Sequence, residues 1–235
     1  MQELDSINSR LGGHAITING LKNLLQHQLF QKPISGKWRM ENGERRMNFK
    51  ADDLFQKPIS VLEIGCGGGD NLRVLKQWAS TKKIKLQLTG VDINEACIQF
   101  AKSQSGNEGI YFICSDYKAV LLDVDIIFSS LFCHHFTDNE LVEMLHWMQQ
   151  RARAGFFIND LHRHPAAYYS IKALTQVFSK SYLVKADAPL SVLRGFKKGE
   201  WIKLFQKAML PHYHIEWRWA FRWLITYKNA GAGTI

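Results

Sequence analysis

The sequence predicts an α/β fold in which helices cover a doubly wound, mostly parallel sheet. Two observations lead to this prediction. Short apolar stretches of strand character alternate with helical stretches from residue 58 to about residue 160. The 235 residues are 46% hydrophobic and 12% aromatic, which is ordinary for a globular chain and enough for one full core.

The first predicted strand contains Val61 to Ile64 and runs directly into a glycine-rich turn, Gly65 to Gly69. Glycine lets the backbone approach a ligand closely because it has no side chain. A dinucleotide-binding fold needs its third glycine at the position of Asp70, a poor neighbour for a pyrophosphate. The turn therefore favours a ligand that carries positive charge, with an ordinary glycine turn as the alternative.

The next two predicted strands end in acidic residues. Residues 86–91 lead into Asp92 and a helix over residues 95–102, and residues 110–114 lead into Asp116. A carboxylate at such a strand end can accept hydrogen bonds from both hydroxyls of a ribose. We interpret Asp92 as a ribose ligand, with a helix cap as the alternative.

Two further strands, residues 124–129 and 155–158, flank a predicted helix over residues 139–150. Right-handed crossovers bring the carboxyl ends of all five strands to one crevice. From His212 to Tyr227 apolar residues occupy odd positions, which predicts an antiparallel hairpin with an odd-length connection. We expect its tryptophans in the core rather than on a base-stacking surface.

Residues 1–57 form a predicted helical N-terminal extension before the α/β domain of residues 58–235. Its helices are expected over residues 4–11 and 18–28. The extension is either a lid over the crevice or a layer that covers the sheet edge. An insertion at about residues 165–200, rich in aromatic rings, is predicted to cap a pocket for an apolar ligand.

Histidines follow the fourth and fifth strands. His134 and His135 come after the fourth, and Asp160 and His162 after the fifth. Histidine can remove a proton near neutral pH, so His134 or His135 is a candidate general base, with a structural histidine as the alternative. No metal is expected: the fourth strand ends in serines rather than carboxylates, and the thiols lack the spacing of a zinc site.

A net charge of +9 favours binding to a nucleic acid, but the basic residues are spread along the chain rather than gathered in one patch. No apolar run approaches the length that spans a membrane, and the N-terminus lacks the pattern of a signal peptide. We therefore expect a cytoplasmic protein that acts on a small molecule, without a membrane span. The sequence leaves its oligomeric state open.

Residues 61–160 resemble the class I, Rossmann-like methyltransferases that depend on S-adenosylmethionine (SAM). The resemblance implies a seven-stranded, mostly parallel sheet with helices on both faces, an antiparallel C-terminal hairpin and a helical N-terminal extension. It implies SAM as cofactor, with Asp116 at the adenine amine. The residues expected at SAM are Glu63, Gly65, Cys66, Gly67, Gly69, Asp92, Ile93, Asp116, Tyr117 and Ser129.

The chain is also similar to the ubiquinone/menaquinone methyltransferase-like branch, including bacterial members associated with polyketide or phenolic-lipid pathways. Residues 11–14, 134–136, 159–161 and 189–192 carry this likeness. It implies transfer of a methyl group to a small aromatic, phenolic or polyketide-type acceptor, with O-methylation favoured. Residues expected near the acceptor are Asp160, His162 and Tyr168.

Three alternatives remain: a C-methyltransferase of a quinone-like ring, an RNA methyltransferase, and a non-catalytic protein that binds SAM. Enzymes that methylate base or amide nitrogens usually carry an Asn/Asp-Pro-Pro-aromatic motif after the fourth strand. This chain has Ser129 to Phe132 there, which weakens the RNA alternative.

Overall fold

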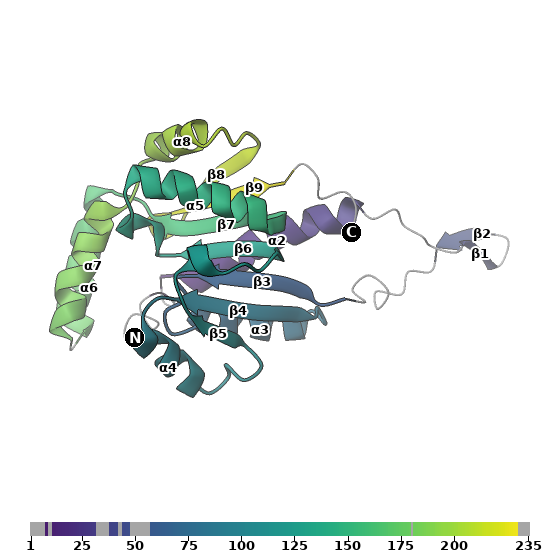
Figure 1. Ribbon diagram of the computed structural model, residues 1–235, viewed down its shortest axis with the longest axis horizontal. Helices are drawn as coiled ribbons and strands as arrows, with labels where there is room; N and C mark the ends of the chain where they lie inside the picture. Colours follow the sequence, from purple (N-terminus) through teal and green to yellow (C-terminus); the bar gives the residue numbers. More distant parts are fainter. Residues whose placement is uncertain are drawn as a thin grey trace.

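The computed structural model describes residues 8, 11–31, 38–41, 44–47, 57–179 and 181–229. Seven strands form one sheet in the order β5-β4-β3-β6-β7-β9-β8 (Figure 1). Their bounds are β3 (Ile59–Ile64), β4 (Leu86–Asp92), β5 (Tyr111–Cys114), β6 (Val124–Ser130), β7 (Ala152–Leu161), β8 (Tyr213–Arg218) and β9 (Arg222–Lys228). Strands β3 to β7 are parallel, and β9 pairs antiparallel with β7 and β8. The predicted fold class is confirmed.

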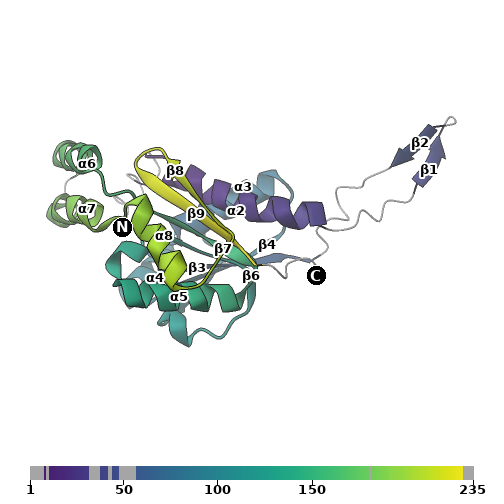
Figure 2. The same ribbon diagram turned by 90° about the horizontal axis from the view of Figure 1, so that it is seen from above.

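Helices cover both faces of this sheet (Figure 2). Because strand side chains alternate between faces, Val61 of β3 lies in one hydrophobic core and Leu62 in the other. The first core is covered by α2 (Gly13–Gln31) and α3 (Asp70–Thr81). The second is covered by α5 (Asp138–Arg151) and α8 (Lys198–Lys207). Helix α4 (Glu95–Ser103) packs along β4 and β5.

Helix α2 belongs to the N-terminal extension and packs on the sheet beside α3. It begins at Gly13, five residues before the predicted start. Its Leu21 and Leu24 are fully buried, and the Asn159 side-chain amide donates to the carbonyl of Gly13 at 3.2 Å. This part of the extension is thus a layer of the fold. Most of the helix predicted over residues 4–11 lies outside the described residues.

Two short strands, β1 (Trp38–Glu41) and β2 (Glu44–Met47), pair with each other in a separate antiparallel sheet. The sequence did not predict them.

The C-terminal hairpin has a three-residue connection between β8 and β9, residues 219–221, as its parity predicted. Trp223 is buried, but Trp217 and Trp219 are 47% and 68% exposed. The prediction that all three tryptophans lie in the core was therefore wrong. Trp217 stands on β8, the edge strand of the sheet, and Trp219 in the turn, and neither packs in the hydrophobic cores of the described residues.

Helices α6 (Pro165–Phe178) and α7 (Tyr182–Arg194) lie within the predicted insertion. They pack against each other through a small cluster that includes Ala167, Ile171 and Val192. We call this helical pair the cap. In the described part of the chain, every helix is too short or too polar to cross a bilayer.

Candidate active site

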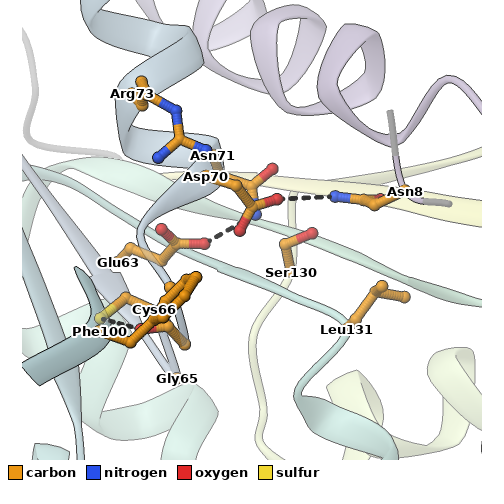
Figure 3. Close-up of a pocket in the computed structure, with 12 residues that line it drawn as sticks. Asn8, Glu63, Gly65, Cys66, Asp70, Asn71, Arg73, Phe100, Ser130 and Leu131 are labelled. Atoms are coloured by element: carbon orange, nitrogen blue, oxygen red, sulfur yellow. Dashed lines mark hydrogen bonds between the residues drawn. The ribbon is translucent and has the colours of Figure 1, made fainter. Parts of the chain in front are cut away.

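A small cavity lies where β3 and β6 end, with a volume of about 160 Å³ (Figure 3). Its lining is polar on one side and includes the glycine turn. The residues around it are Asn8, Glu63, Gly65, Cys66, Gly67, Gly68, Asp70, Asn71, Arg73, Phe100, Ser130 and Leu131. The structure thus brings four of the predicted ligand residues to one wall of the cavity: Glu63, Gly65, Cys66 and Gly67.

The glycine turn has a backbone that other residues rarely adopt. Gly65, Gly67 and Gly69 have φ angles of 68°, 50° and 72°, in the left-handed region that favours glycine. A Cβ on Gly65 would lie 2.2 Å from the ring of Phe132, which is far inside van der Waals contact. Gly69 also caps the start of α3. Glycine therefore lets the turn hold this shape without backbone strain, and at Gly65 without a clash.

Glu63 is a buried carboxylate with one free oxygen. Its Oε1 accepts a hydrogen bond from the Asn71 amide at 3.0 Å, whereas Oε2 has no hydrogen-bond partner among the described residues. Burial, and then the nearby charge of Asp70, raise the pKa of Glu63 well above its usual value. An unpaired buried oxygen in a cavity wall suits a ligand that brings a hydrogen-bond donor or a positive charge.

Asp92 connects the glycine turn to the end of β4. Its Oδ2 accepts from the Gly67 N–H at 2.9 Å and its Oδ1 from the Asn94 N–H at 2.8 Å. The cap of α4 is Asn94, whose side chain accepts from Ala96 N–H at 2.9 Å. Asn94, and not Asp92, is therefore the residue that caps this helix. Each oxygen of Asp92 keeps a lone pair for a further donor.

Ile93 and Asp116 lie on the exposed side of the same edge. Ile93 is 74% exposed. Asp116 is exposed as well, and its Oδ1 accepts from the Lys118 N–H at 2.9 Å. Ile93 follows β4, which pairs with β3, and Asp116 follows β5, which pairs with β4; neither residue lines the cavity.

Two predicted ligands lie elsewhere. The Tyr117 ring is buried in the second core, edge-on to Phe132 and Trp147, so it does not border the cavity. Ser129 is fully buried, with its hydroxyl 3.4 Å from the Cys133 sulfur. Because side chains alternate along β6, the neighbouring Ser130 lines the cavity instead.

A second, larger cavity of about 570 Å³ opens next to the first, beneath the cap. The two cavities share Asn8 and Leu131. Its lining is mostly apolar, as the sequence predicted for the insertion. Its polar groups are Asn8, His134, His135, Ser170, Asp187, Ser191 and Arg222.

His134 and Asp160 form a buried pair at the wall of the larger cavity. Nδ1 of His134 lies 2.8 Å from Oδ1 of Asp160. The carboxylate also accepts the backbone N–H groups of Cys133 and Leu161, each at 2.7 Å. Burial alone would raise the pKa of Asp160, but the His134 charge and these hydrogen bonds bring it below its usual value.

An ionised carboxylate can only accept hydrogen bonds, so Nδ1 of His134 carries the proton. When the ring is neutral, its Nε2 has a free lone pair, which is the arrangement of a general base. His135 stacks near it, with ring centroids 4.2 Å apart. Burial, and then His134, lower the pKa of His135. No carboxylate among the described residues is hydrogen-bonded to His135.

The predicted acceptor residues do not touch the larger cavity. Asp160 is fully buried behind His134. His162 packs on Trp223 with ring centroids 4.7 Å apart, and Tyr168 packs in the cap cluster beside Tyr169. Each prediction relied on sequence position near a strand end or on the cap, which does not determine the direction of a side chain.

Sequence reasoning missed a polar link between the two cavities. The Asn8 amide donates to Asp70 at 3.2 Å, and its oxygen accepts from the Arg222 guanidinium at 3.2 Å. His14 also bonds Asp70, at 2.9 Å. Asn8 and Arg222 are 214 positions apart, and no local motif marks either residue.

Residues 61–155 match the family model of a methyltransferase domain. Over these residues the chain is a SAM-dependent methyltransferase domain, and the match covers less than half of its length. A stretch of 86 residues is 30% identical to a malonyl-[acyl-carrier protein] O-methyltransferase of Priestia megaterium. That alignment covers 36% of this chain and only 30% of the relative's length.

Solved structures share the fold of this methyltransferase domain. The plantazolicin methyltransferase BpumL in complex with S-adenosylhomocysteine (SAH) superposes with a TM-score of 0.57 at 18% identity, over 95% of this chain and 89% of that one. A SAM-dependent methyltransferase from Aquifex aeolicus gives 0.52 at 16% identity, over 72% of this chain and 81% of that one. SAM is the cofactor of such domains, and the residues described above fit it.

The fit rests on the orphaned Glu63 oxygen and on the glycine turn. Glu63 Oε2 would accept from the ammonium group of SAM, whose amino-acid end would lie along the turn that Gly65 keeps open. Asp92 would hold the ribose, and Asp116 the adenine amine. The methyltransferase domain therefore has acceptors of hydrogen bonds at three successive strand ends, β3, β4 and β5.

We predict that Asp92→Ala weakens SAM binding by about 10- to 100-fold, because a charged hydrogen-bond pair to the ribose is lost. The measurement is calorimetric titration with SAH. Asp123→Ala is a matched control, since Asp123 is an exposed carboxylate that pairs with Arg151 away from both cavities. Unchanged affinity of the Asp92 variant would remove the ribose assignment.

Proposed function

We propose that this chain transfers the methyl group of SAM to a hydroxyl oxygen of a small, mostly apolar acceptor. The observation that carries the proposal is the larger cavity, which adjoins the SAM cavity through Asn8 and Leu131. His134 lies in its wall, with Asp160 hydrogen-bonded behind it. A phenolic or polyketide-type ring fits its volume and apolar lining. We also propose that the chain belongs to the ubiquinone/menaquinone methyltransferase-like branch of these enzymes.

Bound SAM supplies an electrophilic methyl group on a positively charged sulfur. The chain's own contribution begins with the apolar cap, which excludes water from the acceptor. His134 takes the proton of the acceptor hydroxyl at Nε2, while Asp160 fixes the ring orientation and stabilises the imidazolium that results. The adjoining cavities hold the two reactants in one geometry, which lowers the entropic cost of the reaction.

A carboxylate is a second candidate acceptor, favoured by Arg222. This guanidinium lines the larger cavity, is 3% exposed, and its Nη1 has no hydrogen-bond partner in the part of the chain that the structure describes. Burial lowers the pKa of Arg222 to about 10, so it stays charged near neutral pH and would complement a carboxylate. The Priestia megaterium relative is described as an O-methyltransferase of malonyl-[acyl-carrier protein].

The test is methyl transfer from isotope-labelled SAM to matched pairs of acceptors. Each pair keeps an alkylated aromatic ring and changes only a phenol to a carboxylic acid, or to a methyl ether that lacks the proton. We expect the phenol to be methylated at oxygen, with the product assigned by NMR. Methylation at ring carbon would favour the C-methyltransferase alternative, and SAM binding without transfer to any acceptor would favour a non-catalytic protein.

A further inference from the structure

The outer surface of the cap carries two rows of exposed apolar side chains. Three of them are large and mostly exposed: Tyr182, Val177 and Tyr169 are 82%, 73% and 68% exposed. We call the two rows together the cap face. They comprise Ala166, Tyr169, Ala173 and Val177 on α6, and Tyr182, Ala186, Leu190 and Leu193 on α7.

The spacing of three or four residues places each row on one side of its helix. The opposite sides of the same helices are buried, through Ala167 and Ile171 on α6 and Val192 on α7. The side chains of the cap face are therefore not needed to pack α6 against α7. Both views place α6 and α7 at one end of the molecule, away from the sheet (Figures 1 and 2).

Basic side chains border the rows. Lys172 is exposed beside the α6 row, and Lys185 and Arg194 flank the α7 row. The single acidic residue of the two helices, Asp187, is also exposed, but it belongs to neither row and lines the larger cavity. An apolar strip between basic side chains is the pattern of helices that lie in the surface of an anionic bilayer.

The entrance of the larger cavity adjoins this surface. Leu174 on α6 is 37% exposed and Trp219 in the β8–β9 turn is 68% exposed, and both line the cavity. Leu174 follows Ala173 of the cap face directly. A bilayer that meets the cap face would therefore lie close to apolar side chains at the cavity rim, and Trp219 is a side chain that favours the membrane interface.

We propose that the cap face docks on an anionic lipid bilayer, with the apolar rows in the acyl boundary and the basic residues among the headgroups. A symmetric contact with a second copy would bring Lys172, Lys185 and Arg194 of both copies together without compensating carboxylates, which disfavours self-association. Docking does not require the reaction proposed above, because it involves none of the residues assigned to SAM or to proton removal.

The test is co-sedimentation of the full chain with phosphatidylcholine vesicles, with and without phosphatidylglycerol. We expect binding that needs the anionic lipid and weakens with salt. Val177→Glu/Leu193→Glu should lower the bound fraction by about tenfold or more, since both carboxylates would enter the apolar boundary. Lys172→Glu/Lys185→Glu should lower affinity by about thirtyfold or more, because two attractive charges become repulsive.

Matched controls lie away from the cap. Leu121→Glu changes a leucine that is 74% exposed, and Lys82→Glu/Lys85→Glu reverses two exposed lysines between α3 and β4. Both should bind vesicles like the unaltered protein, and all variants should keep SAH affinity. Three outcomes would overturn docking: no sedimentation of the unaltered protein with anionic vesicles, equal binding by the cap-face variants, or a dimer that these variants dissociate without any vesicle binding.

Discussion

Replacing His134 by alanine should lower the turnover of methyl transfer to a hydroxyl acceptor by about two to four orders of magnitude. Affinity for SAH should stay within about twofold, because His134 lies in the wall of the larger cavity and not of the smaller one. The loss has a specific physical cause. Without Nε2, no positioned group accepts the hydroxyl proton, and the acceptor must react as the much weaker neutral nucleophile.

His135→Ala is the matched control for this prediction. His135 lines the same cavity with its ring centroid 4.2 Å from that of His134, but Asp160 bonds His134 and not His135. We expect His135→Ala to cost less than about tenfold in turnover. The sequence left the two histidines as equal candidates, and a larger loss at His135 than at His134 would reverse the assignment made from the structure.

Asp160→Asn tests the same pair from its other side. An amide in place of the carboxylate can donate to Nδ1 and would place the imidazole proton on Nε2, which removes the free lone pair. Turnover should then fall about as far as in His134→Ala, and the double variant should lose little more, because the two residues act as a unit. Losses that multiply in the double variant would show that the two side chains act independently.

The choice of acceptor separates a base from a structural histidine. If His134 is the base, the loss in His134→Ala should shrink for phenols that are already ionised in solution, because they have no proton left to remove. A merely structural His134 would lower turnover on every phenol by the same factor. Full turnover in His134→Ala on an identified acceptor would show that positioning alone drives the reaction.

The sequence could predict the sheet and one wall of the site because both depend on local patterns. Apolar runs that end in Gly65, Asp92 and Asp116 indicate parallel strands, and parallel strands bring their carboxyl ends to one edge. The parity of the hairpin also follows from local alternation. These features need no knowledge of which distant segments meet.

The direction of individual side chains could not be predicted in the same way. Ser129 and Ser130 are neighbours at the end of β6, yet opposite faces of the strand bury the first and present the second to the cavity. Tyr117 follows a strand end as expected but turns into the core. Asn8 and Arg222 meet only after the whole sheet has formed, so their contact leaves no local signal.

Replacing Gly65 by alanine should weaken SAH binding by more than about 100-fold, which is the second large effect that the structure predicts. Two costs combine in this variant. Alanine at a φ of 68° loses about 1–2 kcal/mol relative to glycine. Its Cβ would also lie 2.2 Å from the Phe132 ring, so either the ring or the turn must move, and the turn forms the wall of the SAM cavity.

Gly109→Ala isolates the first cost, because Gly109 has a φ of 76° but no atom within 4 Å of the added Cβ. This control should lower the free energy of unfolding by about 1–2 kcal/mol without changing SAH affinity. In Gly65→Ala/Phe132→Ala the clash disappears while the backbone strain remains, so SAH affinity should recover in part. If Gly65→Ala binds SAH like the unaltered protein, or if removal of the Phe132 ring restores nothing, the close approach of turn and ring does not shape the SAM cavity.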